Sequence, residues 1–330
     1  MAEITALTHI EHAWQTAFPT AVTPPTIKLA LVEPSPKFNP GRPTVLAAEE
    51  RGAAGNYTAY QEEVNPTASI AMLATYEQIH YPLEWISGTV SPSGTAAPYT
   101  RDYAGFLATM LTPRYGTLQF GCATGVYELI GAVGTKLTLT QEKKGSPLRA
   151  VATLGGHSMV SGAFAVGPAL SDSVVNIILG SHATVYLDAA LGTMGATPLT
   201  ATVDSLSLDI DPQLNWSDYL GSIYHGDTYH LPWKVTLKLS CEFNAGMKTQ
   251  ADAWIGAAWQ KLIRVKYTTG SSATLKLFQV DFSGTMVNTP EFFSNKSGKL
   301  TMDVELTDSY DATFAHFLKI QTKCATATLL

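Results

Sequence analysis

The sequence predicts a mainly β protein: two tandem β-sandwich domains, each with one flanking α-helix, behind an extended N-terminal arm. Short stretches of alternating polar and apolar residues recur between residues 57 and 306, turn residues separate them, and the order of elements repeats along the chain. A length of 330 residues fits about two domains. We expect the arm at 1–48, the first domain at 49–168 and the second at 171–330.

The N-terminal segment combines one helical pattern with many prolines. Apolar residues at helical spacing predict a helix over 4–18, and they are Leu7, Ile10, Trp14 and Phe18. Seven prolines follow between residues 19 and 43, a density that excludes a regular helix or a central strand. We expect either a loosely packed leader or an arm that lies along a neighbouring subunit.

The first block contains strand patterns and one weak helix. The helix is expected over 76–85, where Pro82 limits it. Strands are expected at 57–60, 68–73, 117–120 and 126–130.

A hairpin closes the first block. Residues 136–140 alternate polar and apolar, a turn follows at 142–147, and residues 148–154 return as the partner strand. We expect Leu137 and Leu139 to face the core, with Thr138 and Thr140 on the other side.

The second block follows a linker at 162–172. Residues 203–211 alternate cleanly, and 233–243 is the longest expected strand, with Val235, Leu237, Leu239 and Cys241 on one face. A helix is expected over 248–262 from its apolar stripe. The other expected strands are 183–188, 275–282, 285–287 and the hairpin 292–306, which turns at 295–298.

The two blocks place the same elements in the same order. In each, a strand leads into a helix, further strands follow, and a hairpin comes last. Helices lie roughly 170 positions apart and hairpins roughly 150, a spacing that predicts two domains of one architecture.

The charge composition argues against a protein that holds nucleic acid. The net charge is −6, from 21 basic and 27 acidic residues. The longest basic cluster is Lys143-Lys144 with Arg149 nearby, at the expected hairpin turn. Binding through phosphates needs a basic patch, so we expect duplex DNA to be repelled or passed rather than held.

The spacing of the cysteines and the hydropathy of the sequence indicate the cellular compartment in which the chain is expected to fold. Cys122, Cys241 and Cys324 are widely spaced and form no CxxC pair, which argues against a disulfide framework or a structural zinc site. We find no signal-peptide pattern and no apolar run of about 20 residues, so we expect synthesis in a reducing cytoplasm and no membrane span.

We expect no enzyme, no cofactor and no metal. His225, Asp227 and His230 offer three potential metal ligands without a fourth. A calcium loop at Asp209, Asp211 and Asp218 lacks the required Gly and Glu, because Leu214 and Leu220 stand there.

Other polar and aromatic patterns also favour structural roles. The Gly-rich segment 155–162 lacks the lysine of a phosphate-binding loop. The adjacent Glu62 and Glu63 are expected on opposite faces of a strand. Trp254 and Trp259 are expected in the buried stripe of the second helix.

Residues 97–156 resemble a known family. Tyr99-Thr-Arg-Asp-Tyr precedes a Tyr-x-Leu-x-Gly segment, a Leu-Thr-Leu strand follows, and a return strand ends in Gly. The matching positions are Tyr127, Leu129, Gly131, Leu137, Leu139 and Gly155. This pattern resembles the major tail tube proteins of siphophages, the long-tailed phages, while the second block is similar to them only in architecture.

The resemblance implies a β-sandwich subunit that joins its inner sheet to those of its neighbours in a ring, and rings that stack into a conduit for the phage genome. Many members place six single-domain copies in a ring, so a tandem-domain chain implies three. The assembly hairpin is then expected to include Leu137, Leu139, Lys143, Lys144, Leu148 and Leu154.

The resemblance also implies partners and a location. We expect contacts with copies of the same chain, with tape measure and terminator proteins, and with DNA in transit. The protein is expected in the virion tail after synthesis in the host bacterial cytoplasm.

Two other functions stay open. A distal or terminator ring of the tail would share the sandwich. A carbohydrate-binding or host-adhesion module would use loop aromatics, for which Trp216, Tyr219, Tyr224 and Tyr229 are the candidates.

Overall fold

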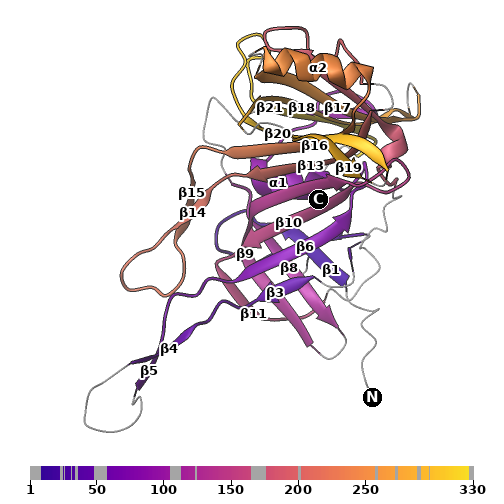
Figure 1. Cartoon of the computed structure of the whole chain (residues 1–330). Coiled ribbons are helices and arrows are strands. Elements are labelled where there is room, and N and C mark those ends of the chain that lie inside the picture. The colour runs from indigo at the N-terminus through magenta and orange to yellow at the C-terminus, as the bar shows by residue number, and fades with distance from the viewer. Residues whose placement is uncertain are drawn as a thin grey trace.

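The computed structural model confirms a mainly β protein. It describes residues 9–22, 25, 27–30, 32–33, 36–47, 58–104, 113–122, 125–164, 176–199, 202–256, 259–271, 274–287, 291–296 and 298–326. In these ranges the chain forms 21 strands and two α-helices. All pairings between the strands are antiparallel. Most of the first half lies in the lower part of Figure 1 and most of the second half in the upper part.

The first half contains eleven strands and helix α1. They are β1 (His9–Trp14), β2 (Ile27–Lys28), β3 (Lys37–Asn39), β4 (Thr44–Ala47), β5 (Thr58–Gln61), β6 (Thr67–Leu73), α1 (His80–Ser87), β7 (Tyr99–Tyr103), β8 (Gly116–Cys122), β9 (Gly125–Gln141), β10 (Arg149–Gly155) and β11 (Ser158–Gly162).

The second half contains ten strands and helix α2. They are β12 (Ala183–Ala189), β13 (Val203–Asp211), β14 (Leu214–Ser217), β15 (Asp227–His230), β16 (Lys234–Glu242), α2 (Ala245–Ile255), β17 (Gln260–Thr269), β18 (Lys276–Met286), β19 (Glu291–Lys296), β20 (Lys299–Asp308) and β21 (Leu318–Cys324).

Strand β9 organises the first half because it belongs to two runs of paired strands. Its N-terminal part pairs with β8 and β11, and β8 continues to β1 and β2. Its C-terminal part pairs with β10, which continues to β6 and β3. Helix α1 packs against β9 and β10.

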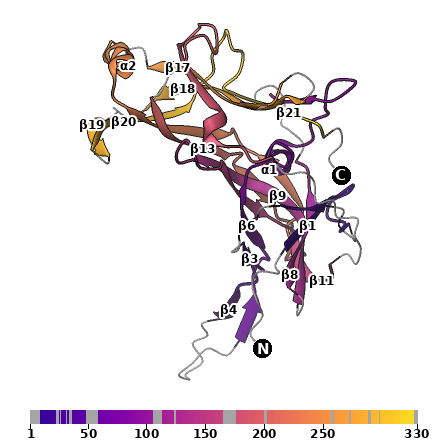
Figure 2. The same ribbon diagram turned by 90° about the vertical axis from the view of Figure 1, so that its right-hand side faces the viewer.

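The second half repeats this pattern of pairing. Strand β18 pairs with β17 and β21, and β17 continues to β12. The C-terminal end of β18 pairs with β20, and β19 continues along the same edge of β20. Strand β20 then pairs with β16, and β16 with β13. Figure 2 shows α2 at the end of the molecule farthest from β4.

Backbone pairing between β9 and β13 joins the run β3–β6–β10–β9 of the first half to the run β13–β16–β20–β19 of the second half, so that they form one sheet. Residues 137–141 of β9 pair with residues 206–210 of β13. The strands therefore follow one another in the order β3, β6, β10, β9, β13, β16, β20 and β19 without a break in hydrogen bonding. Two hairpins, β4–β5 and β14–β15, project from the same side of this sheet in Figure 1.

The predicted N-terminal helix is wrong over its described part. Residues 9–14 form strand β1, which lies between β2 and β8 and is buried on both faces. Ile10 and Trp14 are apolar because the strand is buried, and their spacing does not reflect a helix. Residues 1–8 lie outside the described range, as does most of the expected linker at 162–172.

Both predicted helices are present but displaced. Pro82 occupies the first turn of α1, where its missing N–H would have no intrahelical partner, so it does not end the helix. Helix α2 begins after Asn244, whose side chain accepts hydrogen bonds from the N–H groups of Gly246 and Met247. It ends at Ile255, and the predicted extension to residue 262 is wrong because β17 begins at Gln260.

The two strands predicted at 126–130 and 136–140 form one 17-residue strand, β9. The chain bends between its two parts at Gly131, which has a φ of +69°. A Cβ at this position would lie 2.6 Å from the Phe18 ring, so both the conformation and the close approach require glycine.

The hairpin of β9 and β10 shows the predicted alternation. Leu137 and Leu139 are buried in the core, whereas Thr138 and Thr140 are half-buried on the opposite face. Strand β13 alternates in the same way, with Leu208 buried beside Leu139. The core of the molecule therefore lies on one side of the continuous sheet.

Replacing Leu137 and Leu139 together by Asp should abolish folding. Each buried, unpaired carboxylate costs on the order of several kcal/mol, a large share of the stability of an ordinary domain. Circular dichroism and size-exclusion chromatography measure the loss. The Thr140→Asp variant is the control and should fold, because this half-buried side chain lies outside the core, opposite the exposed Arg149. A folded double variant would place these leucines outside the core.

Candidate functional site

The predicted assembly hairpin divides into a buried side and an exposed turn. Leu148 and Leu154 are buried with the β9 leucines. Lys143 and Lys144 are exposed in the turn, where the side chain of Gln141 donates hydrogen bonds to the carbonyl oxygens of Lys143 and Ser146. The six predicted residues thus share one hairpin, but only the lysines are open to a partner.

The family-like residues lie at the other end of β9. Leu129 is buried and Tyr127 is 53% exposed, with its ring stacked on Phe120. Gly155 ends β10, where a Cβ would lie 3.1 Å from the Trp216 ring. Tyr127 is therefore the one residue of this set whose side chain presents a large exposed surface.

The face of the continuous sheet opposite the core is mainly polar, with Ala71 and Val151 as its apolar members. We call it the polar face, and it consists of Ser69, Ala71, Lys136, Thr138, Thr140, Arg149, Val151, Thr153, Ser205, Ser207, Asp209, Thr236, Lys238, Asp303 and Glu305. The hydroxyl of Thr138 donates a hydrogen bond of 2.5 Å to Asp209 across the β9–β13 pairing. The polar face therefore crosses from the first half to the second without interruption.

Charges on this sheet are nearly balanced. Strands β6, β10, β13, β16, β20 and the C-terminal part of β9 carry five basic and seven acidic side chains, a net charge of −2. Lys136 lies 3.6 Å from Asp209, and Lys238 lies 3.3 Å from Glu305. Exposed pairs of this kind add about 0–1 kcal/mol each to stability, so their main effect is to cancel charge locally.

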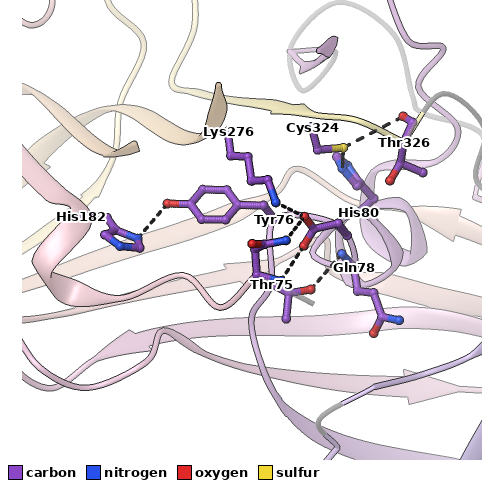
Figure 3. Close-up of polar contacts among 10 residues, drawn as sticks. Thr75, Tyr76, Gln78, His80, His182, Lys276, Cys324 and Thr326 are labelled. Carbon is purple, nitrogen blue, oxygen red and sulfur yellow. Dashed lines mark hydrogen bonds and ion pairs between the residues drawn. The ribbon is translucent and has the colours of Figure 1, made fainter. Parts of the chain in front are cut away.

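A polar network joins the segment before α1 to the second half of the chain (Figure 3). Glu77 accepts hydrogen bonds from the backbone and side chain of Asn176 and forms an ion pair with Lys276 at 2.7 Å. The hydroxyl of Tyr76 lies 3.2 Å from Nδ1 of His182. Since Glu77 and Lys276 are only 10% and 20% exposed, solvent screens this pair less than a surface pair.

His80 forms a buried contact with the C-terminal strand. Its Nδ1 lies 3.1 Å from the Tyr103 hydroxyl on β7, and its Nε2 lies 3.2 Å from the sulfur of Cys324 on β21. Burial, with the nearby charge of Arg101, lowers the pKa of His80 to about 3. A Cys–His pair can act as a nucleophile and base, but both side chains here are fully buried, so no substrate reaches them.

The structure separates some predicted metal ligands and brings others together. Asp209 contacts Lys136, and Asp211 accepts a hydrogen bond from the N–H of Gln213. His230 is buried away from the cluster that His225 forms with Asp218 and Glu63. Glu63 is absent from the predicted metal ligands because no local sequence pattern indicates that the first half contacts this loop.

The predicted aromatic sets are also divided. Trp254 is buried in α2, as expected, but Trp259 is 44% exposed beyond the helix. Trp216 stacks on His225, and Tyr224 packs against His157. Among the four loop aromatics, Tyr219 and Tyr229 are the exposed ones.

Comparisons with known proteins add no assignment. No protein-family model matches the chain, and no curated protein matches its sequence. Within the described ranges, neither helix is long and apolar enough to cross a membrane.

The stability of the protein should fall as the pH falls from 6.5 to 4, in part because of His80 and His12. Burial also lowers the pKa of His12 to about 3. Between pH 6.5 and 3 the unfolded state therefore binds these protons and the folded state does not, which lowers stability by about 1.4 kcal/mol per pH unit for each histidine. In the His80→Gln variant, the loss of stability between pH 6.5 and 4 should be smaller by the contribution of one histidine.

Urea unfolding at pH 7, 6, 5 and 4 measures this difference. The carboxylates contribute equally in both proteins, so the comparison isolates the histidine. Parallel pH profiles for the wild type and the His80→Gln variant would contradict a neutral His80 in the folded state.

Proposed function

We propose that this chain is the major tail tube subunit of a long-tailed phage, a structural virion protein that assembles into stacked rings around a genome conduit. The observation that carries the proposal is the continuous sheet through both halves of the chain, with its core side buried and its other side polar and nearly neutral. The resemblance of residues 97–156 to tail tube proteins supports the same function.

The repeated pairing pattern supports two tandem β-sandwich domains of one fold. The pairings of the two halves correspond strand by strand. They match β1 with β12, β3 with β13, β6 with β16, β8 with β17, β10 with β20 and β11 with β21, while β9 matches β18 and β19 together. In this reading the β9–β13 pairing joins one domain to the next. Three chains would then supply six domains to a ring.

The internal joint suggests how two chains meet. By the correspondence of pairings, β19 occupies the position of the C-terminal part of β9, and β3 occupies that of β13. We therefore propose that β19 of one chain pairs with β3 of the next, with Ser294 opposite Lys37 as Thr140 is opposite Ser207. Ring closure then removes both sheet edges, which would otherwise invite uncontrolled association.

The polar face fits the lining of a conduit. Ion pairs and hydroxyls leave a weak net negative charge of −2 on these strands. Phosphate groups would find few unpaired cations there, so DNA would pass without being held. Heterologous contacts between rings do not close on themselves and would extend the tube.

Two alternatives are less well supported. A distal or terminator ring of the tail would use the same sheet contacts and differ in whether the rings stack. For a carbohydrate-binding or adhesion module, Trp216 and Tyr224 are engaged with rings of their own chain, which leaves fewer exposed aromatics for a sugar.

The Lys37→Cys, Ser294→Cys double variant, made in a Cys122→Ser background, should form disulfide-linked dimers and closed trimers. Directly opposed strand residues have Cα atoms about 4.5–5.5 Å apart, which suits a disulfide. Within one chain the two positions are seven strand spacings apart, roughly 34 Å, so an intramolecular link is impossible. Non-reducing electrophoresis detects the products.

The control places the second cysteine at Lys248 on α2, which is away from the sheet edge and should give no ladder. Negative-stain microscopy of the wild type gives the second readout, with rings and tubes expected. Rings without crosslinks would contradict the proposed register. Dispersed monomers at high concentration would contradict the function itself.

Assembled protein should not bind duplex DNA at physiological salt. The Asp209→Asn, Asp303→Asn, Glu305→Gln variant brings the net charge of these strands to +1, and it should gain binding that weakens steeply with salt. Electrophoretic mobility at several salt concentrations tests both statements. The control neutralises Glu62, Asp102 and Asp252, which lie on other exposed surfaces, and should not bind. Tight binding by the wild type would favour a DNA-packaging role instead.

A further inference from the structure

Three side chains from distant parts of the chain converge at the loop end of the β14–β15 hairpin. Nδ1 of His225 lies 2.7 Å from a carboxylate oxygen of Asp218 and 2.8 Å from one of Glu63. The three potential ligand atoms all lie within 4.8 Å of one another. One ring nitrogen carries at most one hydrogen, so a neutral His225 cannot give each carboxylate a full hydrogen bond.

The imidazole is held in place from outside the cluster. His225 is 2% exposed, and its ring stacks on Trp216 with centroids 4.8 Å apart and an angle of 12° between the planes. Its backbone oxygen accepts a hydrogen bond of 2.7 Å from Nδ1 of His157. Its own Nε2 is buried and has no hydrogen-bond partner among the described residues, so the ring meets polar groups through Nδ1.

Backbone hydrogen bonds hold the segments that carry Glu63 and Asp218 on either side of the His225 ring. The N–H of Val64, next to Glu63, donates to the carbonyl oxygen of Ile223 at 2.7 Å. The loop that carries Asp218 is closed by a hydrogen bond of 2.8 Å from Gly226 to Ser217. Glu63 and Asp218 are 50% and 55% exposed, so an ion and its water ligands can approach from solvent.

We propose that Glu63, Asp218 and His225 bind one divalent transition-metal cation, Zn²⁺ or Mn²⁺. Imidazole nitrogen suits zinc and other transition metals, and carboxylate oxygen suits manganese, so a mixed set of one nitrogen and two oxygens favours these ions over Ca²⁺ or Mg²⁺. Two carboxylates and a neutral imidazole carry a charge of −2, which a divalent cation cancels. Three protein ligands leave further positions for water.

The cation links two parts of the chain that lie far apart in sequence. Glu63 lies in the segment between β5 and β6 in the first half, whereas Asp218 and His225 belong to the loop between β14 and β15 in the second. Binding therefore fixes the direction in which this hairpin projects from the sheet. The site goes beyond the proposed tube function and does not depend on it.

Calorimetric titration of the untagged full chain with ZnCl₂ and MnCl₂, after removal of metals with a chelator, tests the site. We expect one ion per chain and a rise in the thermal midpoint of at least about 2 °C at saturation. The Glu63→Gln and Asp218→Asn variants keep shape and fold, since both side chains are half-exposed, and each should bind at least about tenfold more weakly.

The Glu62→Gln variant is the matched control. It removes the same charge one residue away, on an exposed side chain outside the cluster, and should bind like the wild type. Absence of binding by the wild type, or equal binding by the Glu63→Gln, Asp218→Asn and His225→Gln variants, would overturn the proposal. Binding of Ca²⁺ in preference to both transition metals would also overturn it, because the imidazole would then not be a ligand.

Discussion

Backbone pairing between β9 and β13 is the contact on which the architecture depends. Each half of the chain builds its own run of strands around a long central strand, β9 or β18. Five residues of β9 pair with five of β13 and turn the two runs into one sheet. Because side chains alternate across strands, this register also aligns Leu139 with Leu208 in the core and Thr138 with Asp209 on the polar face. A shift by one residue would expose the leucines and bury the aspartate.

Two further contacts hold the halves in the orientation that this pairing needs. The network of Glu77, Asn176 and Lys276 fixes the segment before α1 against the second half. Strand β7 pairs with β21, so the first half contributes a strand to the outer run of the second. His80 of α1 contacts Tyr103 of β7 and Cys324 of β21. It stays neutral because burial lowers its pKa to about 3, and a charged ring at this buried place would have no compensating partner.

Much of the fold could be predicted from the sequence, and the site could not. Alternation identified 203–211, 233–243 and the hairpin of Leu137 and Leu139, since each has one buried and one polar face. It failed for β1, which is buried on both faces and therefore lacks alternation. Strand β17 has such an alternation, of Ile263, Val265 and Tyr267 with Arg264 and Lys266, but the helical spacing of apolar residues continues past Gly256 and predicts helix over its first residues. Pairing of β9 with β13, and the approach of Glu63 to His225, depend on tertiary contacts that no local pattern encodes.

Because β9 and β13 belong to one chain, their pairing does not depend on the protein concentration. When two strands that pair belong to separate molecules, dilution separates them, because association carries a large entropic cost. Here the chain itself holds β13 close to β9 through the segment that contains β10, β11 and β12, so the effective concentration of each strand for the other does not depend on dilution. This joint should therefore be as complete in a single isolated molecule as in a concentrated solution, and newly made chains would carry it before they meet any other copy.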